Sequence, residues 1–274
     1  MHTLNLIGCG RAARTLARLW HEAGWARIGG VINRTSDSAR AACDFIGAGT
    51  PHAGLSDLPP ADLWLLGVPD RAIAPVAQQL AQSGRVRRGD GVFHLSGATP
   101  AAALAALAEQ GARVASVHPV MSFAEPARAC ATFAGTLCGI EGEATLAREL
   151  HDAVSVIGGE GFAVAAEHKL LYHAASVFAS NFLVVTLDRA REAYTRAGVD
   201  DDVAVRLLAP LARGALDNVL ALGGEAALTG PAARGDVELV RAQQAEVAAW
   251  DAPSGEAYAA LSALALRLAA EKRD

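Results

Sequence analysis

A glycine-rich turn near the start of the chain joins a short apolar run to a helical pattern. The turn has the form G-x-G-x-x-A and consists of Gly8, Cys9, Gly10, Arg11, Ala12 and Ala13. Gly8 permits a tight turn, Gly10 lets a diphosphate approach the backbone, and Ala13 is small enough for the helix to pack on the strand. The apolar run over residues 4–7 and the helical pattern over residues 11–23 supply the context that makes this turn specific. This order predicts a dinucleotide-binding α/β fold; the alternative is a strand-to-helix turn that holds no ligand.

The first 156 residues continue this alternation of short apolar runs and helical patterns. Such alternation predicts an α/β protein with a doubly wound, mostly parallel sheet, a Rossmann fold, covered by helices on both faces. The expected strands are residues 4–7, 26–33, 62–68, 91–95, 113–117 and 132–140. The expected helices are residues 11–23, 36–46, 71–82, 100–110 and 143–156.

The pattern changes after Gly158 and Gly159. Helical segments follow at residues 167–197, 201–220, 236–250 and 256–272. We therefore expect two domains, a Rossmann domain over residues 1–158 and an all-helical substrate domain over residues 159–274.

Composition excludes several classes of protein. The chain has 274 residues and a net charge of −5, which argues against nucleic acid as a partner. The uncharged apolar stretch 174–187 is too short for a membrane span, which needs about 20 residues. Four scattered cysteines, with no C-x-x-C pair, indicate reduced thiols rather than a disulfide framework or a zinc site. We expect a cytoplasmic protein without a metal.

The end of the second predicted strand indicates which nucleotide is bound. Enzymes that use NAD usually place Asp or Glu here, bonded to the ribose 2′-hydroxyl. This chain has Asn33, Arg34 and Thr35 instead. A guanidinium suits a 2′-phosphate, so we expect NADP(H) in preference to NAD(H). The alternative is that Arg34 is an exposed loop residue.

Three further strand ends carry candidate site residues, because open α/β sheets bind ligands at the carboxyl ends of their strands. Val68 and Pro69 are expected to line the nicotinamide ribose, and Ser96 and Gly97 the nicotinamide or the substrate. His118 follows the fifth strand, where an imidazole can exchange protons with a hydroxyl or an amine. A loop histidine with a structural hydrogen bond is the alternative for His118.

A polar stripe runs along the first helix of the second domain. Lys169, His173, Ser176 and Ser180 fall on one face of this apolar helix, and Asn181 lies at its edge. The lysine is informative because the chain has only two among its 24 Lys and Arg residues, and an ammonium is readily tuned to exchange a proton. We expect Lys169 and His173 to be catalytic and the other three to contact a small-molecule substrate. The alternative is a solvated helix face with a snorkelling lysine.

The segment 229–236 combines rigid and permissive backbone with one cation and one anion. Arg234 is a candidate for binding a substrate carboxylate or a cofactor phosphate. The alternative is an ordinary helix connection with Asp236 as the N-cap of the next helix.

These motifs resemble those of the 6-phosphogluconate dehydrogenase-like superfamily, which includes prephenate dehydrogenase, ketopantoate reductase and pyrroline-5-carboxylate reductase. The resemblance is greatest to bacterial Rossmann-like oxidoreductases whose helical half is a domain of unknown function. It rests on the glycine turn, V-P-D at 68–70, H-L-S-G at 94–97, H-P at 118–119, H-K-L-L-Y-H-A-A at 168–175, S-N at 180–181 and G-P-A-A-R-G-D at 230–236. It implies an NADP-dependent oxidoreductase and a homodimer built through the helical domain.

The resemblance also suggests roles for individual residues. His118 matches the histidine of the H-P-M motif of prephenate dehydrogenases, although Val120 replaces the methionine. Lys169 matches the lysine of the K-x-x-x-N motif of hydroxyacid dehydrogenases, but His173 stands where asparagine is expected, which puts the substrate class in doubt. We expect hydride transfer to or from a C=O or C=N group of a hydroxy- or amino-acid-like molecule. The alternatives are an NADP(H)-binding sensor or scaffold without catalysis, and a deazaflavin-linked reductase.

Overall fold

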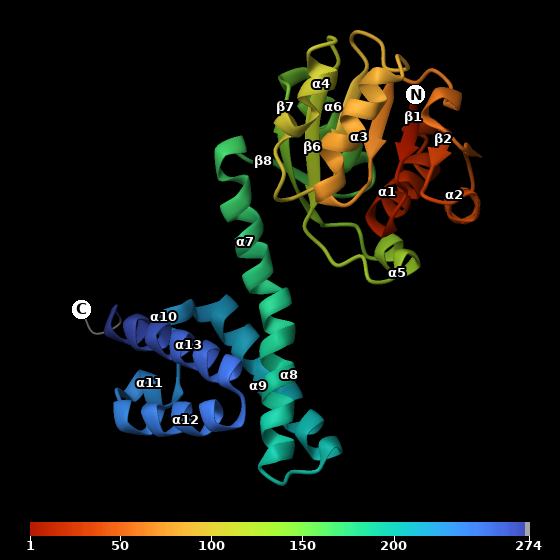
Figure 1. Ribbon diagram of the computed structural model, residues 1–274. Coiled ribbons are helices and arrows are strands. Elements are labelled where there is room, and N and C mark those ends of the chain that lie inside the picture. Colours follow the sequence, from red (N-terminus) through yellow and green to blue (C-terminus); the bar gives the residue numbers. More distant parts are fainter. Residues whose placement is uncertain (272–274) are drawn as a thin grey trace. The chain divides into compact units, whose positions relative to one another are not determined.

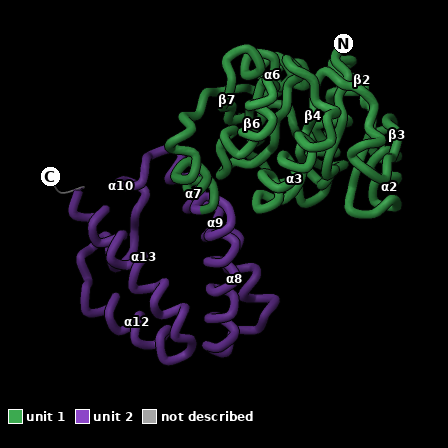
Figure 2. Tube along the Cα trace, turned by 45° about the horizontal axis from the view of Figure 1, so that its top comes forward, with its two compact units in different colours: residues 1–177 green, residues 178–274 purple. Residues whose placement is uncertain are grey.

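The computed structural model describes residues 1–271, which form two compact units. The first unit comprises Met1–Val177 and the second begins at Phe178 (Figure 2). All strands of the described chain belong to the first unit, and the second unit consists of helices (Figure 1).

The first unit is built on one eight-stranded sheet with the order β3-β2-β1-β4-β5-β6-β7-β8. Its strands are β1 (His2–Ile7), β2 (Ala26–Ile32), β3 (Thr50–Pro51), β4 (Leu63–Leu66), β5 (Gly91–His94), β6 (Arg113–Pro119), β7 (Leu137–Gly142) and β8 (Glu160–Ala163). Strands β1 to β6 are parallel, whereas β7 pairs antiparallel with β6 and parallel with β8. The strand order reverses at β1, so the carboxyl ends of β1 and β4 form the topological switch point at which such sheets bind ligands.

Helices cover both faces of this sheet (Figure 1). The helices of the first unit are α1 (Arg11–Glu22), α2 (Ser36–Ile46), η1 (Leu55–Asp57), α3 (Asp70–Gln82), η2 (Ala101–Leu104), α4 (Ala105–Ala108), α5 (Pro126–Ala131), α6 (Ala144–Val156), η3 (Ala166–His168) and α7 (Lys169–Ala179), whose last two residues lie in the second unit.

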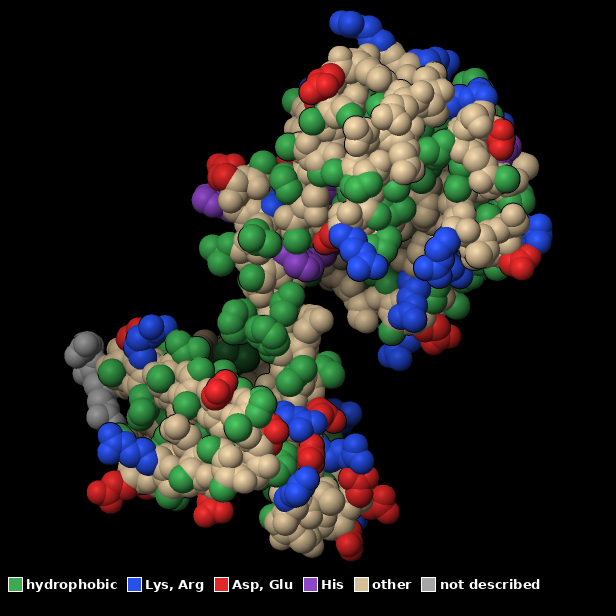
Figure 3. Space-filling model, in the orientation of Figure 1, with side chains coloured by type: hydrophobic (Ala, Val, Ile, Leu, Met, Phe, Trp, Pro, Cys, Tyr) green, Lys and Arg blue, Asp and Glu red, His purple; other side chains and the backbone are tan. Residues whose placement is uncertain are grey.

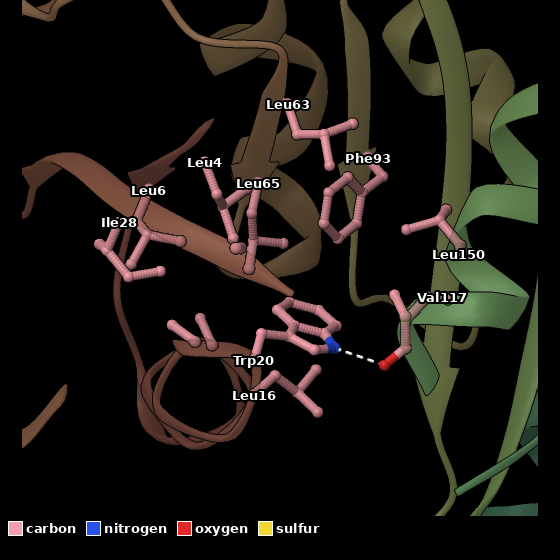
Figure 4. Packing of buried hydrophobic residues seen from close by; sticks show 14 of the residues in the cluster. Leu4, Leu6, Leu16, Trp20, Ile28, Leu63, Leu65, Phe93, Val117 and Leu150 are labelled. Atoms are coloured by element: carbon pink, nitrogen blue, oxygen red, sulfur yellow. Dashed lines mark hydrogen bonds between the residues drawn. The ribbon is translucent and has the colours of Figure 1, made fainter. Parts of the chain in front are cut away.

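Apolar side chains at helical spacing explain why these helices pack on the sheet. On α1 the buried positions include Ala13, Leu16, Ala17 and Trp20, which form one stripe along the helix. Trp20 donates a hydrogen bond from Nε1 to the backbone carbonyl of Ala153 (2.8 Å), which ties α1 to α6 within the core on that face (Figure 4). A second core, which includes residues of α3 and α4, fills the opposite face.

The observed elements confirm the predicted α/β class, and several of them differ from the sequence prediction. The two short edge strands β3 and β8 were not predicted, because neither carries an extended apolar run. The segment expected as a strand over 132–140 begins in a turn after α5, and its strand starts only at Leu137. The helix expected over 100–110 is a 3₁₀ turn followed by one short helical turn.

The expected domain boundary near Gly158 lies inside the first unit. Strand β8 follows that glycine and pairs with β7, and α7 then supplies side chains to the same unit. The single helix expected over 167–197 is divided at Ser180, whose backbone (φ −127°, ψ −71°) interrupts the helix between α7 and α8.

The second unit consists of α8 (Asn181–Arg196), α9 (Asp201–Leu222), α10 (Gly224–Ala227), α11 (Gly230–Arg234), α12 (Val237–Trp250) and α13 (Ala252–Glu271). Helix α9 packs on α8, and α13 packs on α10, α11 and α12. A hollow of about 980 Å³ lies between the α8–α9 pair and residues Gln243 and Tyr258 of α12 and α13, and apolar side chains line most of it.

This helical unit leaves much apolar surface uncovered (Figure 3). Among its described residues, α8 has no buried position and α9 has one, Ala204. Val184, Leu211 and Leu220 are 68%, 61% and 78% exposed. The helical segment 166–196 is also long and apolar enough to cross a membrane by length and composition, with none of its most apolar window buried. One such segment is weak evidence for a membrane span.

Candidate functional site

The glycine turn lies at the switch point of the sheet. Gly8 has a left-handed backbone (φ +78°), and a Cβ there would lie 2.5 Å from Cγ1 of Val68. Gly67, which follows β4, approaches the same turn, since a Cβ on it would lie 2.2 Å from the carbonyl oxygen of Gly8. The close approach of β1 and β4 thus requires small residues on both strands, as a dinucleotide-binding turn does.

The beginning of α1 suits an anionic group. Gly10 caps the helix without any side-chain hydrogen bond, and the first turn contains no acidic residue. By contrast, Asp37 and Asp70 stand in the first turns of α2 and α3. Unpaired N–H groups, the positive end of the helix dipole and the exposed cation Arg11 together favour a diphosphate at α1. The residues present therefore fit a dinucleotide.

The end of β2 braces this turn. Asn33 accepts a hydrogen bond from the backbone N–H of Cys9 (2.5 Å) and donates one to the carbonyl oxygen of Ser38 (2.8 Å). Thr35 uses its hydroxyl to cap α2, accepting from the N–H of Ser38 (3.2 Å). Both side chains thus hydrogen-bond to neighbouring residues of the chain, and Arg34 is the exposed cation of this segment.

The residues that end β4 and β5 shape the same edge. Pro69 precedes α3 as its N-cap residue, and Val68 packs against Gly8. Ser96 is buried and accepts hydrogen bonds from the N–H groups of Ala98 (3.2 Å) and Thr99 (2.9 Å), so its hydroxyl closes a turn. Whether these side chains touch a cofactor stays a prediction.

Two histidines meet above Gly97, and we call them the imidazole pair. His118 comes from β6 and His173 from α7; their ring centroids lie 5.5 Å apart at an interplanar angle of 77°. A Cβ on Gly97 would lie 2.7 Å from Nε2 of His118 and 2.7 Å from Nδ1 of His173. Nδ1 of His173 is buried and has no hydrogen-bond partner within the described chain. Nδ1 of His118 shares a hydrogen bond with the hydroxyl of Tyr172 (2.8 Å).

Lys169 is buried beside this pair, with a side chain only 2% exposed. Its ammonium donates a hydrogen bond to the hydroxyl of Ser116 and lies 3.7 Å from Oε2 of Glu141. The same Glu141 oxygen accepts from the hydroxyl of Ser116 (3.2 Å) and from the N–H of Ala101 (2.8 Å). The predicted alternative of a snorkelling lysine on a solvated face is therefore wrong, because β6 and β7 enclose the ammonium.

Burial controls the charges in this region. Desolvation lowers the pKa of Lys169, and the carboxylate of Glu141 opposes that shift. Desolvation, followed by the charges of His173 and Lys169, lowers the pKa of His118 to about 4. The same causes, burial and then the Lys169 charge, lower the pKa of His94 to about 4. Both histidines are therefore neutral at pH 7.

The structure brings Lys169, His173, His118 and Gly97 together within the first unit. The residues predicted to contact the substrate are distributed over both units. Ser176 lies on α7 in the first unit, whereas Ser180, Asn181 and Arg234 belong to the second unit. Asp236 caps α12, accepting from the N–H of Leu239 (3.2 Å), which confirms the structural alternative for that residue.

Sequence reasoning missed Tyr172, Ser116 and Glu141. Two signals were present: Ser116 stands two residues before His118, hence on the same face of its strand, and Glu141 is the first charged residue after the uncharged run 129–140. Tyr172 had no distinguishing signal, because an aromatic residue on an apolar helix is ordinary core composition.

Two family comparisons cover most of the chain. Residues 3–119 match the family described as a Rossmann-like domain, and residues 136–265 match the domain of unknown function DUF2520. The chain thus combines a segment that matches the Rossmann-like domain with a segment that matches DUF2520. This combination confirms the predicted resemblance to Rossmann-like proteins whose helical half is a domain of unknown function.

Solved structures agree with this architecture. A protein from Thermotoga maritima is 27% identical, with 99% of this chain and 100% of that chain covered and a TM-score of 0.75. A Bacteroides fragilis protein named as a candidate NADP oxidoreductase is 24% identical, with 97% and 98% covered and a TM-score of 0.79. Pyrroline-5-carboxylate reductase from Coxiella burnetii is 18% identical, with 98% and 97% covered and a TM-score of 0.59. None of the curated proteins matches the chain.

Proposed function

We propose that this DUF2520 protein is an NADP-dependent oxidoreductase that acts on a C=O or C=N group of a small molecule. The observation that carries the proposal is the imidazole pair at the carboxyl ends of β5 and β6, in the same unit as a dinucleotide-binding glycine turn. The likeness to reductases of the same fold supports it.

The chain's own residues divide the work of such a reaction. Nicotinamide, when bound, exchanges a hydride with the substrate carbon. In the reductive direction the electron pair of the double bond moves to the heteroatom, which must then gain a proton. A neutral imidazole can relay that proton, because it accepts one at one ring nitrogen as it gives one up at the other, and the imidazole pair has two nitrogens facing Gly97.

In this proposal Lys169 influences the imidazole pair through its charge and does not contact the substrate. Its ammonium is enclosed and is already engaged with Ser116 and Glu141, so direct contact with substrate would require it to leave both partners. Its charge lowers the pKa of His118 and so helps to keep that imidazole neutral. We therefore assign the substrate-facing roles to His118 and His173.

Preference for NADP is tested by fluorescence titration with NADPH and NADH. The guanidinium of Arg34 is exposed and makes no hydrogen bond or ion pair within residues 1–271, which leaves it available to a 2′-phosphate. We expect NADPH to bind at least about tenfold more tightly than NADH, or about 1.4 kcal/mol. Arg34→Ala should abolish this difference and leave NADH binding unchanged.

Arg27→Ala is the matched control, since Arg27 is an exposed arginine near the opposite end of the same strand. It should leave both affinities unchanged. Failure of both nucleotides to bind the wild-type protein would rule out the proposed function.

A second copy of the chain is the proposed partner. The apolar hollow of the helical unit and its exposed leucines and valines resemble the uncovered half of a core. We propose that a homodimer covers this surface, and that the protein is cytoplasmic, with all four cysteines free.

A further inference from the structure

Two glycines in the first unit lack a backbone reason to be glycine. Neither Gly97 nor Gly139 has a positive φ. Gly139 lies inside β7, where glycine weakens a strand because it has no side chain to pack. Both glycines are instead required by the side chains that lie against them. A Cβ on Gly139 would lie 2.8 Å from the hydroxyl of Tyr172, and a Cβ on Gly97 would clash with His118 and His173.

Because Gly97 and Gly139 have no side chains, the rings of Tyr172, His118 and His173 can lie close together. Tyr172 lies edge-on to His118, with centroids 5.5 Å apart and planes at 89°. Its hydroxyl rests over Gly139 and reaches Nδ1 of His118 at 2.8 Å. On the other side of His118, its own Nε2 and the Nδ1 of His173 each lie 2.7 Å from the position that a Cβ on Gly97 would take. The two nitrogens are thus close enough for one atom that lies between them to contact both.

The hydrogen bond between Tyr172 and His118 has one reasonable direction. Burial raises the pKa of Tyr172 to about 12, so the phenol keeps its proton at pH 7, and His118 is neutral. Nδ1 of His118 is the one hydrogen-bond partner of this phenol within the described residues. A phenol O–H is more acidic than a neutral imidazole N–H, and the unprotonated imidazole nitrogen is the more basic acceptor, so Tyr172 donates and Nε2 of His118 carries the proton.

We propose that Tyr172 is a positioning residue that holds His118 with its Nε2–H on the side of Gly97 and His173, where it binds a substrate oxygen that bears a lone pair. This inference rests on the proposed function and narrows its substrate class. A fixed N–H group donates its hydrogen bond to an acceptor, such as a carbonyl or hydroxyl oxygen. A protonated imine has no lone pair on nitrogen, so the site selects carbonyl compounds and their alcohols over iminium ions.

Nitrogen-15 spectra of histidine-labelled protein at pH 7 test the positioning role without any substrate. The His118 signals are assigned by their loss in His118→Gln. In the wild-type protein we expect Nδ1 of His118 to be unprotonated and hydrogen-bonded, and Nε2 to be protonated. Tyr172→Phe and Gly139→Ala should each convert His118 to a mixture of tautomers, the first by removing the hydroxyl and the second by displacing it.

Gly214→Ala is the matched control, because Gly214 has no atom within 4 Å of its missing Cβ and lies in the helical unit. It should leave the His118 signals unchanged. Thermal unfolding of each variant verifies that it is folded. A protonated Nδ1 in the wild type, or wild-type signals in both Tyr172→Phe and Gly139→Ala, would overturn the inference.

The substrate class is tested by NADPH oxidation with a 2-oxo acid and with a cyclic imine at pH 7. We expect the carbonyl compound to be the better substrate, with Tyr172→Phe lowering kcat at least tenfold and changing KM for NADPH less than twofold. A preference for the protonated imine, or a kcat that does not respond to Tyr172→Phe, contradicts the inference. If NADPH does not bind at all, the proposed function fails, and the spectra alone decide the role of Tyr172.

Discussion

At the scale of single residues, the unusual feature of this protein is a set of ionisable side chains removed from water. His94 is fully buried at the end of β5. It accepts a hydrogen bond from the N–H of Ser96 (3.2 Å) through Nδ1, so its Nε2 carries the proton and faces the carbonyl oxygen of Pro100 (3.4 Å). A second proton, on Nδ1, would face the N–H of Ser96, which is a donor and not an acceptor.

This burial predicts how stability changes with pH. The pKa values of His94 and His118 fall from 6.5 to about 4 on folding. Between these values the unfolded chain binds more protons than the native protein, so the free energy of unfolding increases with pH. We expect this stabilisation to be complete above about pH 6.5 and to be lost as the pH falls towards 4.

Urea unfolding at pH 7 and pH 4.5 measures this effect. His94→Asn removes one of the two titrating rings, so the decrease in unfolding free energy on acidification should be smaller in the variant, by on the order of 1–3 kcal/mol. If the wild type and the variant lose the same stability, His94 does not contribute to the pH dependence.

At the scale of elements, the protein depends on how closely its strands and turns approach one another. The turn between β1 and α1 passes against the residues that follow β4, and only glycine at position 8 allows this. Gly24, after α1, has a similar left-handed backbone (φ +69°) but no atom within 4 Å of its missing Cβ. A substitution at either position would therefore strain the backbone, but only a side chain at position 8 would also clash with neighbouring atoms.

Comparison of Gly8→Ala with Gly24→Ala separates these two effects. Alanine in the left-handed region costs about 1 kcal/mol at either position. At position 8 the new methyl group also overlaps Val68, and such overpacking adds about 1–3 kcal/mol. Urea unfolding should rank Gly8→Ala below Gly24→Ala, and NADPH binding should be lost in the first variant alone. Equal stabilities would show that the turn relaxes to make room.

At the scale of the whole molecule, the helical unit has more apolar surface than a monomer in water usually exposes. Only Ala204, Val240, Ser254, Gly255 and Ala269 are buried among its described residues. Two environments could cover the rest, a second copy or a lipid bilayer. The polar residues Ser180 and Asn181 interrupt the apolar segment between α7 and α8, and this favours the second copy.

Light scattering during gel filtration tests the homodimer. We expect the wild type to elute with the mass of two chains. Leu211→Glu places a charge in the apolar hollow and should shift the protein to monomer or strongly reduce its solubility, because an unpaired charge in an interface is costly. Val156→Glu, at an exposed apolar position of α6, should leave the dimer intact. A wild-type monomer that binds lipid vesicles would favour the membrane instead.

Local residue patterns were enough to predict the class of the first unit and the position of its glycine turn. Both features are local. A turn needs particular residues at neighbouring positions, and apolar residues recur with a period of two in strands and of 3.6 in helices. His118, at a strand end, and Gly97, at another, could be placed at one edge of the sheet because parallel strands end together.

The environment of each site residue was decided only by the tertiary structure. Lys169 looked like part of an exposed stripe, yet β6 and β7, which lie about 30–50 residues earlier in the chain, enclose it with Ser116 and Glu141. The partnership of Tyr172 with His118 depends equally on the space left by Gly139. Burial and charge at a side chain are sums over neighbours that are distant in sequence, so a local pattern can name the residue but cannot give its protonation state or its role.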